Sequence, residues 1–169
     1  MADRQGPGAI SVNLLVDIAD VVVSADPRHS LVTGPLGSCL AVAAWEPQAR
    51  VGGMLHFALP DSSLDETRRE VAPAMFCDSG LRALLAQMAE RGAVCERLEV
   101  RVAGASRLLS DEPSFELGKR NYLALRKQLK LLGIPLCAEH VGDSIRRALR
   151  LSIGDGQVTL ITRTGETRL

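Results

Sequence analysis

The sequence has no long apolar run, no excess of charge of either sign and no paired cysteine motif. None of its apolar stretches approaches the roughly 20 residues that a membrane-spanning helix needs. Its 20 basic and 20 acidic side chains balance, so no charge excess indicates electrostatic binding of nucleic acid. We therefore expect neither a membrane-spanning protein nor a nucleic-acid-binding protein.

The cysteines show no C-x-x-C spacing, so the sequence predicts neither a zinc site nor a disulfide framework. They lie at positions 39, 77, 95 and 137. We expect Cys77, Cys95 and Cys137 to be structural thiols. The first residues lack the basic segment and apolar core of a secretory signal, so we expect a cytoplasmic protein without a cofactor.

Length and periodicity indicate the fold class. The 169 residues, 46% of them hydrophobic, are enough for one domain with a substantial core, which we place at residues 10–169 after a flexible segment 1–9. Strands and helices mix without strict alternation, which favours an α+β fold with a mixed or antiparallel sheet. The expected strands lie within 10–23, 40–45, 50–59, 97–103, 136–140, 148–153 and 157–162, and the helices at about 78–91 and 115–132. Residues 60–73 are expected to form a polar loop, and His29 a surface turn.

The central stretch, residues 31–61, contains a cysteine and a histidine in unusual positions. Cys39 opens an apolar run that ends at Pro47, and a second run carries His56. Proline suits the second position of a β-turn, so the two runs predict an antiparallel hairpin. A turn centred between Pro47 and Gln48 places Cys39 opposite His56, with Cβ atoms about 4.5–5.5 Å apart. A slip of one residue would separate them, and Gly52-Gly53 is a possible bulge.

A thiol beside an imidazole is a plausible nucleophile. A free thiol has a pKa of about 8.5 and is mostly protonated at neutral pH, whereas a neighbouring imidazole can accept its proton. Backbone N–H groups of the glycine-containing turn before Cys39 are candidate donors to an oxyanion. From the residues alone, a buried structural cysteine and histidine are the more common interpretation of such a pair.

Several motifs resemble the CheD family of chemoreceptor glutamine deamidases. They are Thr33, the segment Gly37-Ser38-Cys39-Leu40-Ala41-Val42, the segment Gly52-Gly53-Met54-Leu55-His56, and Leu59-Pro60-Asp61. Weaker similarity continues through Asp78, Gly104, Gly118 with Arg120-Asn121, and Gly142 with Arg147. The chain departs from the family at Ala105 and Asp143, where the second of two glycines is expected.

The resemblance implies a layered sandwich of sheets with helices outside, a fold also found in certain toxin deamidases. It implies that Cys39 attacks the carboxamide of a receptor glutamine, that His56 is the base, and that Thr33 orients His56. It also makes esters of receptor glutamates possible substrates. Gly37, Ser38, Asp61 and Asp78 are weaker candidates for oxyanion binding or substrate positioning.

Two alternatives remain open at this stage. The chain is alternatively a regulatory module that binds chemoreceptors or a CheC-type phosphatase with little or no turnover. A metal site built from Cys39, His56 and Asp61 is a third, weaker hypothesis. The implied partners are methyl-accepting chemotaxis receptors, with no nucleic acid and no membrane insertion.

Overall fold

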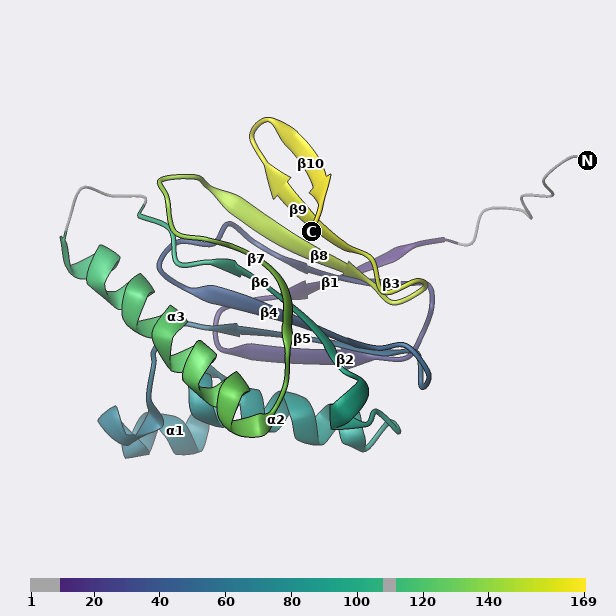
Figure 1. Ribbon diagram of the computed structural model, residues 1–169, viewed down its shortest axis with the longest axis horizontal. Coiled ribbons are helices and arrows are strands. Elements are labelled where there is room, and N and C mark those ends of the chain that lie inside the picture. The colour runs from purple at the N-terminus through teal and green to yellow at the C-terminus, as the bar shows by residue number, and fades with distance from the viewer. Residues whose placement is uncertain (1–9, 108–111) are drawn as a thin grey trace, which may run out of the picture.

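The chain folds into two five-stranded β-sheets and a set of helices, seen in a computed structural model that describes residues 10–107 and 112–169 (Figure 1). Sheet A has the spatial order β1 (Val12–Val16), β3 (His29–Thr33), β8 (Arg147–Ser152), β9 (Val158–Thr162) and β10 (Gly165–Arg168). Sheet B has the order β2 (Asp20–Ser24), β5 (Val51–Phe57), β4 (Leu40–Glu46), β6 (Glu99–Gly104) and β7 (Leu136–Val141).

Both sheets are mixed, as the α+β prediction requires. In sheet A, β1 and β3 run parallel and the other neighbours run antiparallel. In sheet B, only β6 and β7 are parallel. The helices are α1 (Glu66–Val71), α2 (Cys77–Ala89) and α3 (Glu112–Leu132), with single 3₁₀ turns at Ser62–Leu64, Pro73–Met75 and Cys95–Arg97.

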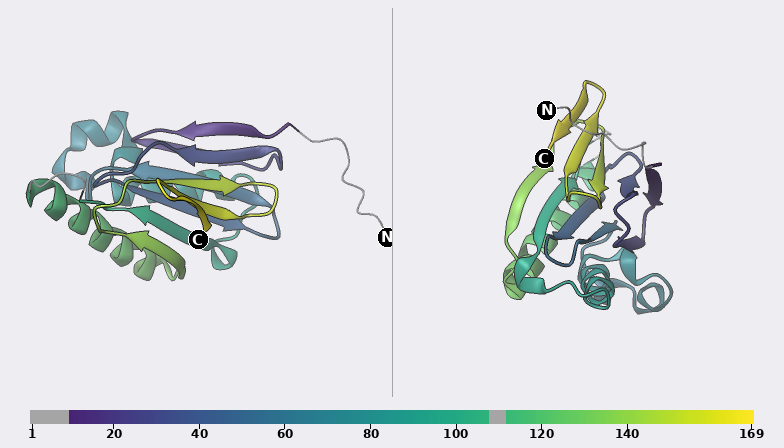
Figure 2. Two further views of the ribbon diagram at one scale, coloured as in Figure 1. Left: turned by 90° about the horizontal axis from the view of Figure 1, so that it is seen from above. Right: turned by 90° about the vertical axis from the view of Figure 1, so that its right-hand side faces the viewer.

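Sheet B forms the centre of the molecule because both of its faces are covered. Along β4, Ala41, Ala43 and Trp45 belong to the apolar cluster shared with sheet A. The alternate residues, Leu40, Val42 and Ala44, belong to the cluster shared with α2 and α3. Figures 1 and 2 show these helices on one side of sheet B, away from β8, β9 and β10. Burial on both faces explains why β4 reads as a continuous apolar run rather than an alternating one.

The two glycines of β5 allow this close layering and do not form a bulge. They pair regularly, Gly52 with Trp45 and Gly53 with Ala44. A Cβ atom on Gly52 would lie 2.4 Å from Ile153 of the sheet A side, and one on Gly53 would lie 2.6 Å from Leu84 of α2. The absence of side chains at these positions therefore brings both neighbouring layers close to β5.

Most of the expected elements are present, with several corrections. Residues 10–23 form two short strands, β1 and β2, where the pattern was compatible with two strands or one bent strand, and the C-terminal hairpin is confirmed as β8 and β9. The polar segment 60–73 contains α1, and β10 was not expected. His29 begins β3, where its Nδ1 lies 2.8 Å from the Ser24 hydroxyl, instead of lying in a surface turn. The predicted flexible segment 1–9 lies outside the described residues.

Neither Asp78 nor Ser79 caps helix α2, although both lie where the helix was expected to begin. Helix α2 has Phe76 at its N-cap position and no side-chain cap. The Asp78 carboxylate instead accepts hydrogen bonds from Ser62, at 2.9 Å from its backbone nitrogen and 2.6 Å from its hydroxyl. The hydroxyl of Ser79 donates to the Pro73 carbonyl oxygen at 2.5 Å. Tertiary contacts to the preceding segment thus replace the local cap.

The predicted β4–β5 hairpin is confirmed, but its register differs from the predicted one by two residues. Glu46 pairs with Val51, so the turn holds four residues, and Ala41 rather than Cys39 lies opposite His56. The Glu46 carboxylate accepts a hydrogen bond from the Gln48 nitrogen at 2.8 Å, which fixes the wider turn. Because side chains alternate with a period of two, this shift keeps Cys39 and His56 on one face.

Candidate active site

His56 is buried near the end of β5 with one ring nitrogen bound and the other free. Its side chain is 3% exposed, and its Nδ1 lies 3.3 Å from the Val16 carbonyl oxygen at the end of β1. A carbonyl oxygen only accepts, so Nδ1 must carry the proton and Nε2 must hold the lone pair. Among the described residues, Nε2 has no hydrogen-bond partner. This tautomer is the one that can accept a proton from a nucleophile.

Burial keeps both candidate catalytic side chains neutral at neutral pH. It lowers the pKa of His56 below 6.5, against the opposing effects of the Val16 hydrogen bond and the charges of Asp17 and Asp20. It also raises the pKa of the Cys39 thiol above 9.0, with the backbone N–H of Cys39 acting in the opposite direction. The pair is therefore a thiol and a neutral imidazole, as expected where the proton moves only during attack.

Cys39 lies at the end of a loop in which three consecutive carbonyl groups, those of residues 37–39, accept hydrogen bonds. The Gly37 carbonyl oxygen accepts from the Ser106 nitrogen at 2.7 Å, and the Cys39 carbonyl oxygen accepts from the Ala105 nitrogen at 2.8 Å. The Ser38 carbonyl oxygen accepts from Asn121 Nδ2 at 3.1 Å. Three donors from two other elements thus fix the approach to Cys39.

These bonds also orient the N–H groups of the same loop. A trans peptide directs its C=O and N–H in opposite directions, so binding the carbonyl groups of Gly37 and Ser38 turns the N–H groups of Ser38 and Cys39 the other way. Within the described part of the chain, the N–H groups of Gly37, Ser38 and Cys39 meet no acceptor on another residue. They are therefore candidate oxyanion donors beside the thiol.

The thiol and the imidazole share one face of sheet B but are not hydrogen-bonded. Ala41 lies opposite His56, and the bond from the Ala105 nitrogen to the Cys39 carbonyl oxygen continues the β4–β6 ladder by one residue. Alternation therefore directs Cys39 to the same side as Ala41 and His56. His56 Nε2 has no partner among residues 10–107 and 112–169, so the predicted thiol–imidazole bond is not formed. Catalytic hydrogen bonds are often loose before substrate binds.

Thr33 lies next to this arrangement without a hydrogen bond to His56. It is 3% exposed and pairs with Val16 across the parallel β1–β3 ladder. Its hydroxyl oxygen accepts from the Leu149 nitrogen at 3.0 Å. The group at His56 Nδ1 is the Val16 carbonyl oxygen, a backbone contact that no sequence motif indicated. The orienting role of Thr33 remains a prediction.

The two positions where the chain departs from the double-glycine pattern both have left-handed backbone. Ala105 has φ of 50° and Asp143 has φ of 56°. Ala105 is the residue whose nitrogen holds the Cys39 carbonyl group, and the Gly104 carbonyl oxygen accepts from the Gly142 nitrogen at 3.0 Å. Asp tolerates this conformation better than Ala does. The backbone path is therefore that of a glycine pair, maintained with strain at Ala105.

Arg147 fixes the loop that leads into the site. Its guanidinium, 1% exposed, donates to the carbonyl oxygens of Ile145 at 3.2 Å and His140 at 2.7 Å and also to that of Gly142. Its own carbonyl oxygen accepts from the Leu36 nitrogen at 2.7 Å. Burial lowers the pKa of Arg147. Arg147 therefore holds the segment before β8 in place. It is one of the residues that carry the weaker part of the resemblance to the CheD family.

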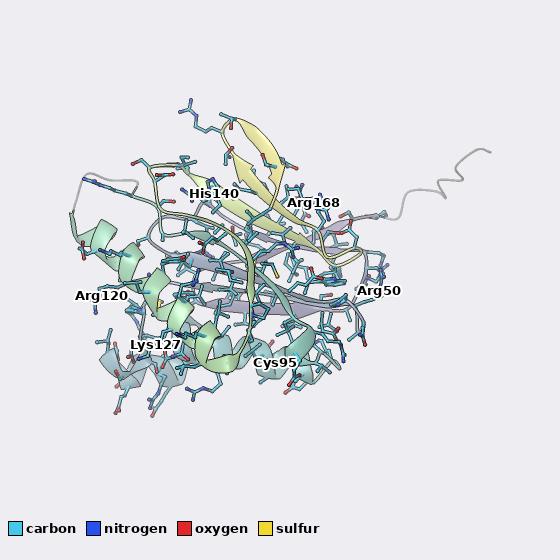
Figure 3. The ribbon with its side chains drawn as sticks, viewed as in Figure 1. Arg50, Cys95, Arg120, Lys127, His140 and Arg168 are labelled. Carbon is cyan, nitrogen blue, oxygen red and sulfur yellow. The ribbon has the colours of Figure 1, made fainter. Side chains whose placement is uncertain are left out.

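The weaker candidates Asp61 and Asp78 hold the segment that follows β5. Asp61 caps the turn at Ser62–Leu64 by accepting from the Ser63 nitrogen at 2.8 Å, and this bond lowers its pKa. Asp78 holds Ser62, as described above. Both line a surface cavity of about 320 Å³ between this segment and α3, where Arg120 and Lys127 also lie (Figure 3). The structure thus gives each a local structural partner, and no hydrogen bond joins either of them to Cys39 or His56 among the described residues.

The metal hypothesis receives no support from this geometry. In the described ranges, no three His, Cys, Asp or Glu side chains lie close enough together to hold a metal ion. Cys39, His56 and Asp61 therefore do not form a ligand set. As for membrane association, none of the described helices is both long and apolar enough to span a bilayer.

Comparison with known proteins gives a consistent result. A family model described as "CheD chemotactic sensory transduction" matches residues 58–162, a range that begins two residues after His56. A probable chemoreceptor glutamine deamidase CheD of Solibacter usitatus is 43% identical over 147 residues, 87% of each chain. A second probable deamidase of this name, from Anaeromyxobacter dehalogenans, is 41% identical over 86% of this chain and 91% of the relative.

A more distant relative extends the same similarity. The chemoreceptor glutamine deamidase CheD of Thermotoga maritima is 33% identical over 151 residues, which cover 89% of this chain and 92% of that protein. The family match and these relatives together span nearly the whole described fold and both strands that carry the candidate residues. The chain belongs to the CheD family.

Proposed function

We propose that the protein is a protein-glutamine deamidase that acts on chemoreceptors. The relatives named above are called chemoreceptor glutamine deamidases. The observation that carries the proposal is the unpaired, buried Nε2 of His56 on the same sheet face as Cys39, beside a row of free N–H donors. A nucleophile, a base in the correct tautomer and oxyanion donors are the parts that amide hydrolysis needs.

In the proposed first step, Cys39 Sγ attacks the side-chain carboxamide carbon of a receptor glutamine while His56 Nε2 takes the thiol proton. The carbonyl oxygen becomes an oxyanion, which the N–H groups of Ser38 and Cys39 stabilise, with Gly37 as a further candidate. The carbon–nitrogen bond then breaks, and His56 returns the proton to the departing ammonia. A thioester between Cys39 and the glutamyl group remains.

In the second step, His56 Nε2 takes a proton from water, which attacks the thioester carbon. The carbon–sulfur bond breaks, the proton returns to Cys39, and the product is glutamate. One water is consumed and one ammonia is released for each glutamine. The same acyl-enzyme would form from a glutamyl methyl ester with methanol as leaving group, so ester hydrolysis is compatible with this site.

The remaining candidates have supporting roles in this proposal. Thr33 supports the end of β1, where the Val16 carbonyl group fixes the His56 tautomer, through its pairing with Val16. Asp61 and Asp78 act on substrate through the segment that they hold next to the site. The proposed location is the cytoplasm, because a catalytic thiol needs a reducing compartment, and all four cysteines are free.

Ammonia release from a receptor cytoplasmic fragment tests the nucleophile. Cys39→Ala should abolish release, and Cys137→Ala, which removes an exposed thiol, is the matched control that should retain it. Ammonia release by Cys39→Ala at the wild-type rate would refute the assignment.

The alternative is a regulatory module that binds chemoreceptors or a CheC-type phosphatase without turnover. A thiol-reactive glutamine analogue distinguishes the two, because only a site that binds and activates the carboxamide should direct the label to Cys39. Labelling of the exposed Cys137 in preference to Cys39 would favour the binding module.

A further inference from the structure

Helix α3 carries one polar side chain in the middle of its buried stripe. Asn121 is 0% exposed and is followed at intervals of four by Leu125 and Leu129, which are 0% and 2% exposed. One turn before it, Gly118 lies against the backbone of Ala105, where a Cβ atom would lie 3.3 Å from that residue. An asparagine therefore occupies a position where the helix pattern calls for an apolar residue.

Both N–H bonds of the Asn121 amide are used, and they go to two different segments. Nδ2 lies 3.1 Å from the Ser38 carbonyl oxygen and 2.8 Å from the Ala58 carbonyl oxygen. Ser38 precedes the proposed nucleophile, and Ala58 follows the proposed base by two residues. One side chain thus joins the two segments that carry the reacting groups.

The junction lies where the backbone ladder of the hairpin ends. Leu40 and Phe57 form the last β4–β5 pair, and in that register Cys39 and Ala58 would come next. Their backbones instead bind elsewhere, because the Cys39 carbonyl group accepts from Ala105 and the Ala58 nitrogen donates to the Met75 carbonyl group at 3.0 Å. The Asn121 amide bridges the hairpin arms at the point where they separate.

The other polar atom of the Asn121 side chain is left without a partner among the described residues. Its Oδ1 is buried and has no hydrogen-bond partner among the residues that the structure describes. A buried acceptor without a partner lowers stability, and an apolar residue of the same size would avoid that cost. The unpaired Oδ1 of Asn121 therefore lowers the stability of the fold. The two hydrogen bonds that Nδ2 donates are what this residue contributes at the position.

We propose that Asn121 is a positioning residue for deamidation. It holds the Ser38–Cys39 peptide so that the Cys39 N–H faces the oxyanion, and it fixes the distance between the nucleophile loop and the segment after His56. The inference depends on the proposed nucleophilic role of Cys39. Asn121 touches no reacting atom, so its effect is on geometry in the transition state rather than on substrate affinity.

The test uses Asn121→Leu, which matches the side-chain volume, removes both donors and removes the unpaired Oδ1. Deamidation of a purified receptor cytoplasmic fragment should show kcat reduced about 100-fold, the loss typical of misplacing a reacting group by about 1 Å. KM should change less than about threefold, because ground-state binding is not affected. The thermal unfolding midpoint should fall, because the carbonyl groups of Ser38 and Ala58 lose their donor, but by less than in a variant that opens a cavity in the same stripe.

The matched control is Leu129→Ala, two turns further along the same buried stripe. It creates a cavity in the core and should lower the unfolding midpoint more than Asn121→Leu does, yet keep the wild-type kcat at a temperature where it is folded. Wild-type kcat in Asn121→Leu, or an equal loss of kcat in Leu129→Ala, would overturn the inference. If Cys39→Ala also retained activity, the proposed function itself would fail, so the two failures are distinguishable.

Discussion

The two ends of the β4–β5 hairpin differ in whether their buried polar groups are hydrogen-bonded. At the turn end, the buried Glu46 carboxylate accepts from Arg97 Nε at 3.0 Å and from its terminal nitrogen at 2.7 Å, as well as from two backbone nitrogens of the turn. Arg50 lies at this end, at the right of Figure 3. At the open end, His56 Nε2 and Asn121 Oδ1 are buried without partners among the described residues, and the N–H groups of Gly37 and Ser38 meet no acceptor there.

The third unpaired atom belongs to the same open end. His140 Nδ1 is buried without a partner, and His140 lies on one rung of sheet B with His56, joined through the pairs of Ala41 and Ala103. Every buried side-chain nitrogen or oxygen without a partner in the described residues thus lies at the end that carries Cys39. Unsatisfied polar groups cost stability, so their concentration at one end indicates that this end is shaped by function and the other by folding.

After removal of the nucleophile itself, replacing the base should give the largest effect. His56→Gln removes the proton acceptor and should lower kcat for deamidation by about 10²–10⁴-fold. Stability should be nearly unchanged, since the ring makes one hydrogen bond in the described structure. Steady-state kinetics on a receptor fragment, with unfolding curves for both proteins, measure this. If the variant lost enough stability to explain its lower rate, His56 would act in folding, and the functional difference between the two ends of the hairpin would not hold.

The pH dependence of kcat and of thiol alkylation tests whether Cys39 and His56, at the open end, are both neutral at neutral pH. Because burial lowers the pKa of His56 below 6.5, the base remains available at neutral pH, and kcat should decline only at pH values below about 6.5. Because burial raises the pKa of Cys39 above 9.0, its alkylation by iodoacetamide without substrate should accelerate only in alkaline buffer. Rapid alkylation of Cys39 at pH 6 would indicate a preformed ion pair and contradict this account.

Removing the charge at the turn end should reduce stability without changing catalysis. Hydrogen bonding to Arg97 lowers the pKa of Glu46 to about 2 from 4.5, so between these values the unfolded chain binds the proton and the folded chain does not. The contribution is complete above pH 4.5 and lost as pH falls toward 2. Glu46→Gln should therefore melt below wild type at pH 7, with a difference that shrinks through this window. Its kcat should equal that of wild type.

Replacement of Asp78 tests whether the substrate site extends from the hairpin to the segment after β5. Asp78→Ala leaves the buried backbone N–H of Ser62 without an acceptor, which should cost about 1–3 kcal/mol of unfolding free energy. If the segment after β5 positions substrate, KM should rise about tenfold, or 1.4 kcal/mol, while kcat is unchanged. An unchanged KM would restrict the site to the hairpin and α3.

The smallest effect is expected at Ala105, where the change should be stabilising. Glycine removes the cost of a left-handed alanine, about 1 kcal/mol, without altering the hydrogen bond to the Cys39 carbonyl group. Chemical denaturation of Ala105→Gly should show a higher free energy of unfolding with unchanged kcat. A lower free energy would mean that the positive φ at Ala105 carries no strain.

The sequence was sufficient for the hairpin but not for its register, and the reactive roles of Cys39 and His56 remain predictions. The runs before and after Pro47 indicated the strands, whereas the four-residue turn depends on Glu46 contacting Arg97, which lies 51 positions away. The resulting error of two residues kept Cys39 and His56 on one face, so the geometry remains compatible with the proposed chemistry. An error of one residue would have separated them.

Contacts between distant segments explain what else the sequence left open. The Val16 carbonyl group at His56 lies 40 positions away and involves only backbone, so no residue type signals it. Asn121 contacts segments 83 and 63 positions away. The only local signal for Asn121 is an amide in an apolar helical stripe, which becomes informative once the helix is placed against the hairpin.

The most direct test of the central claim is mass spectrometry of a chemoreceptor co-expressed with this protein. With the wild-type chain, specific receptor glutamines should show the mass gain that accompanies replacement of an amide NH₂ by OH. With Cys39→Ala, which should leave both ends of the hairpin folded, the same glutamines should stay unmodified. Modification of the same glutamines by Cys39→Ala would contradict the account.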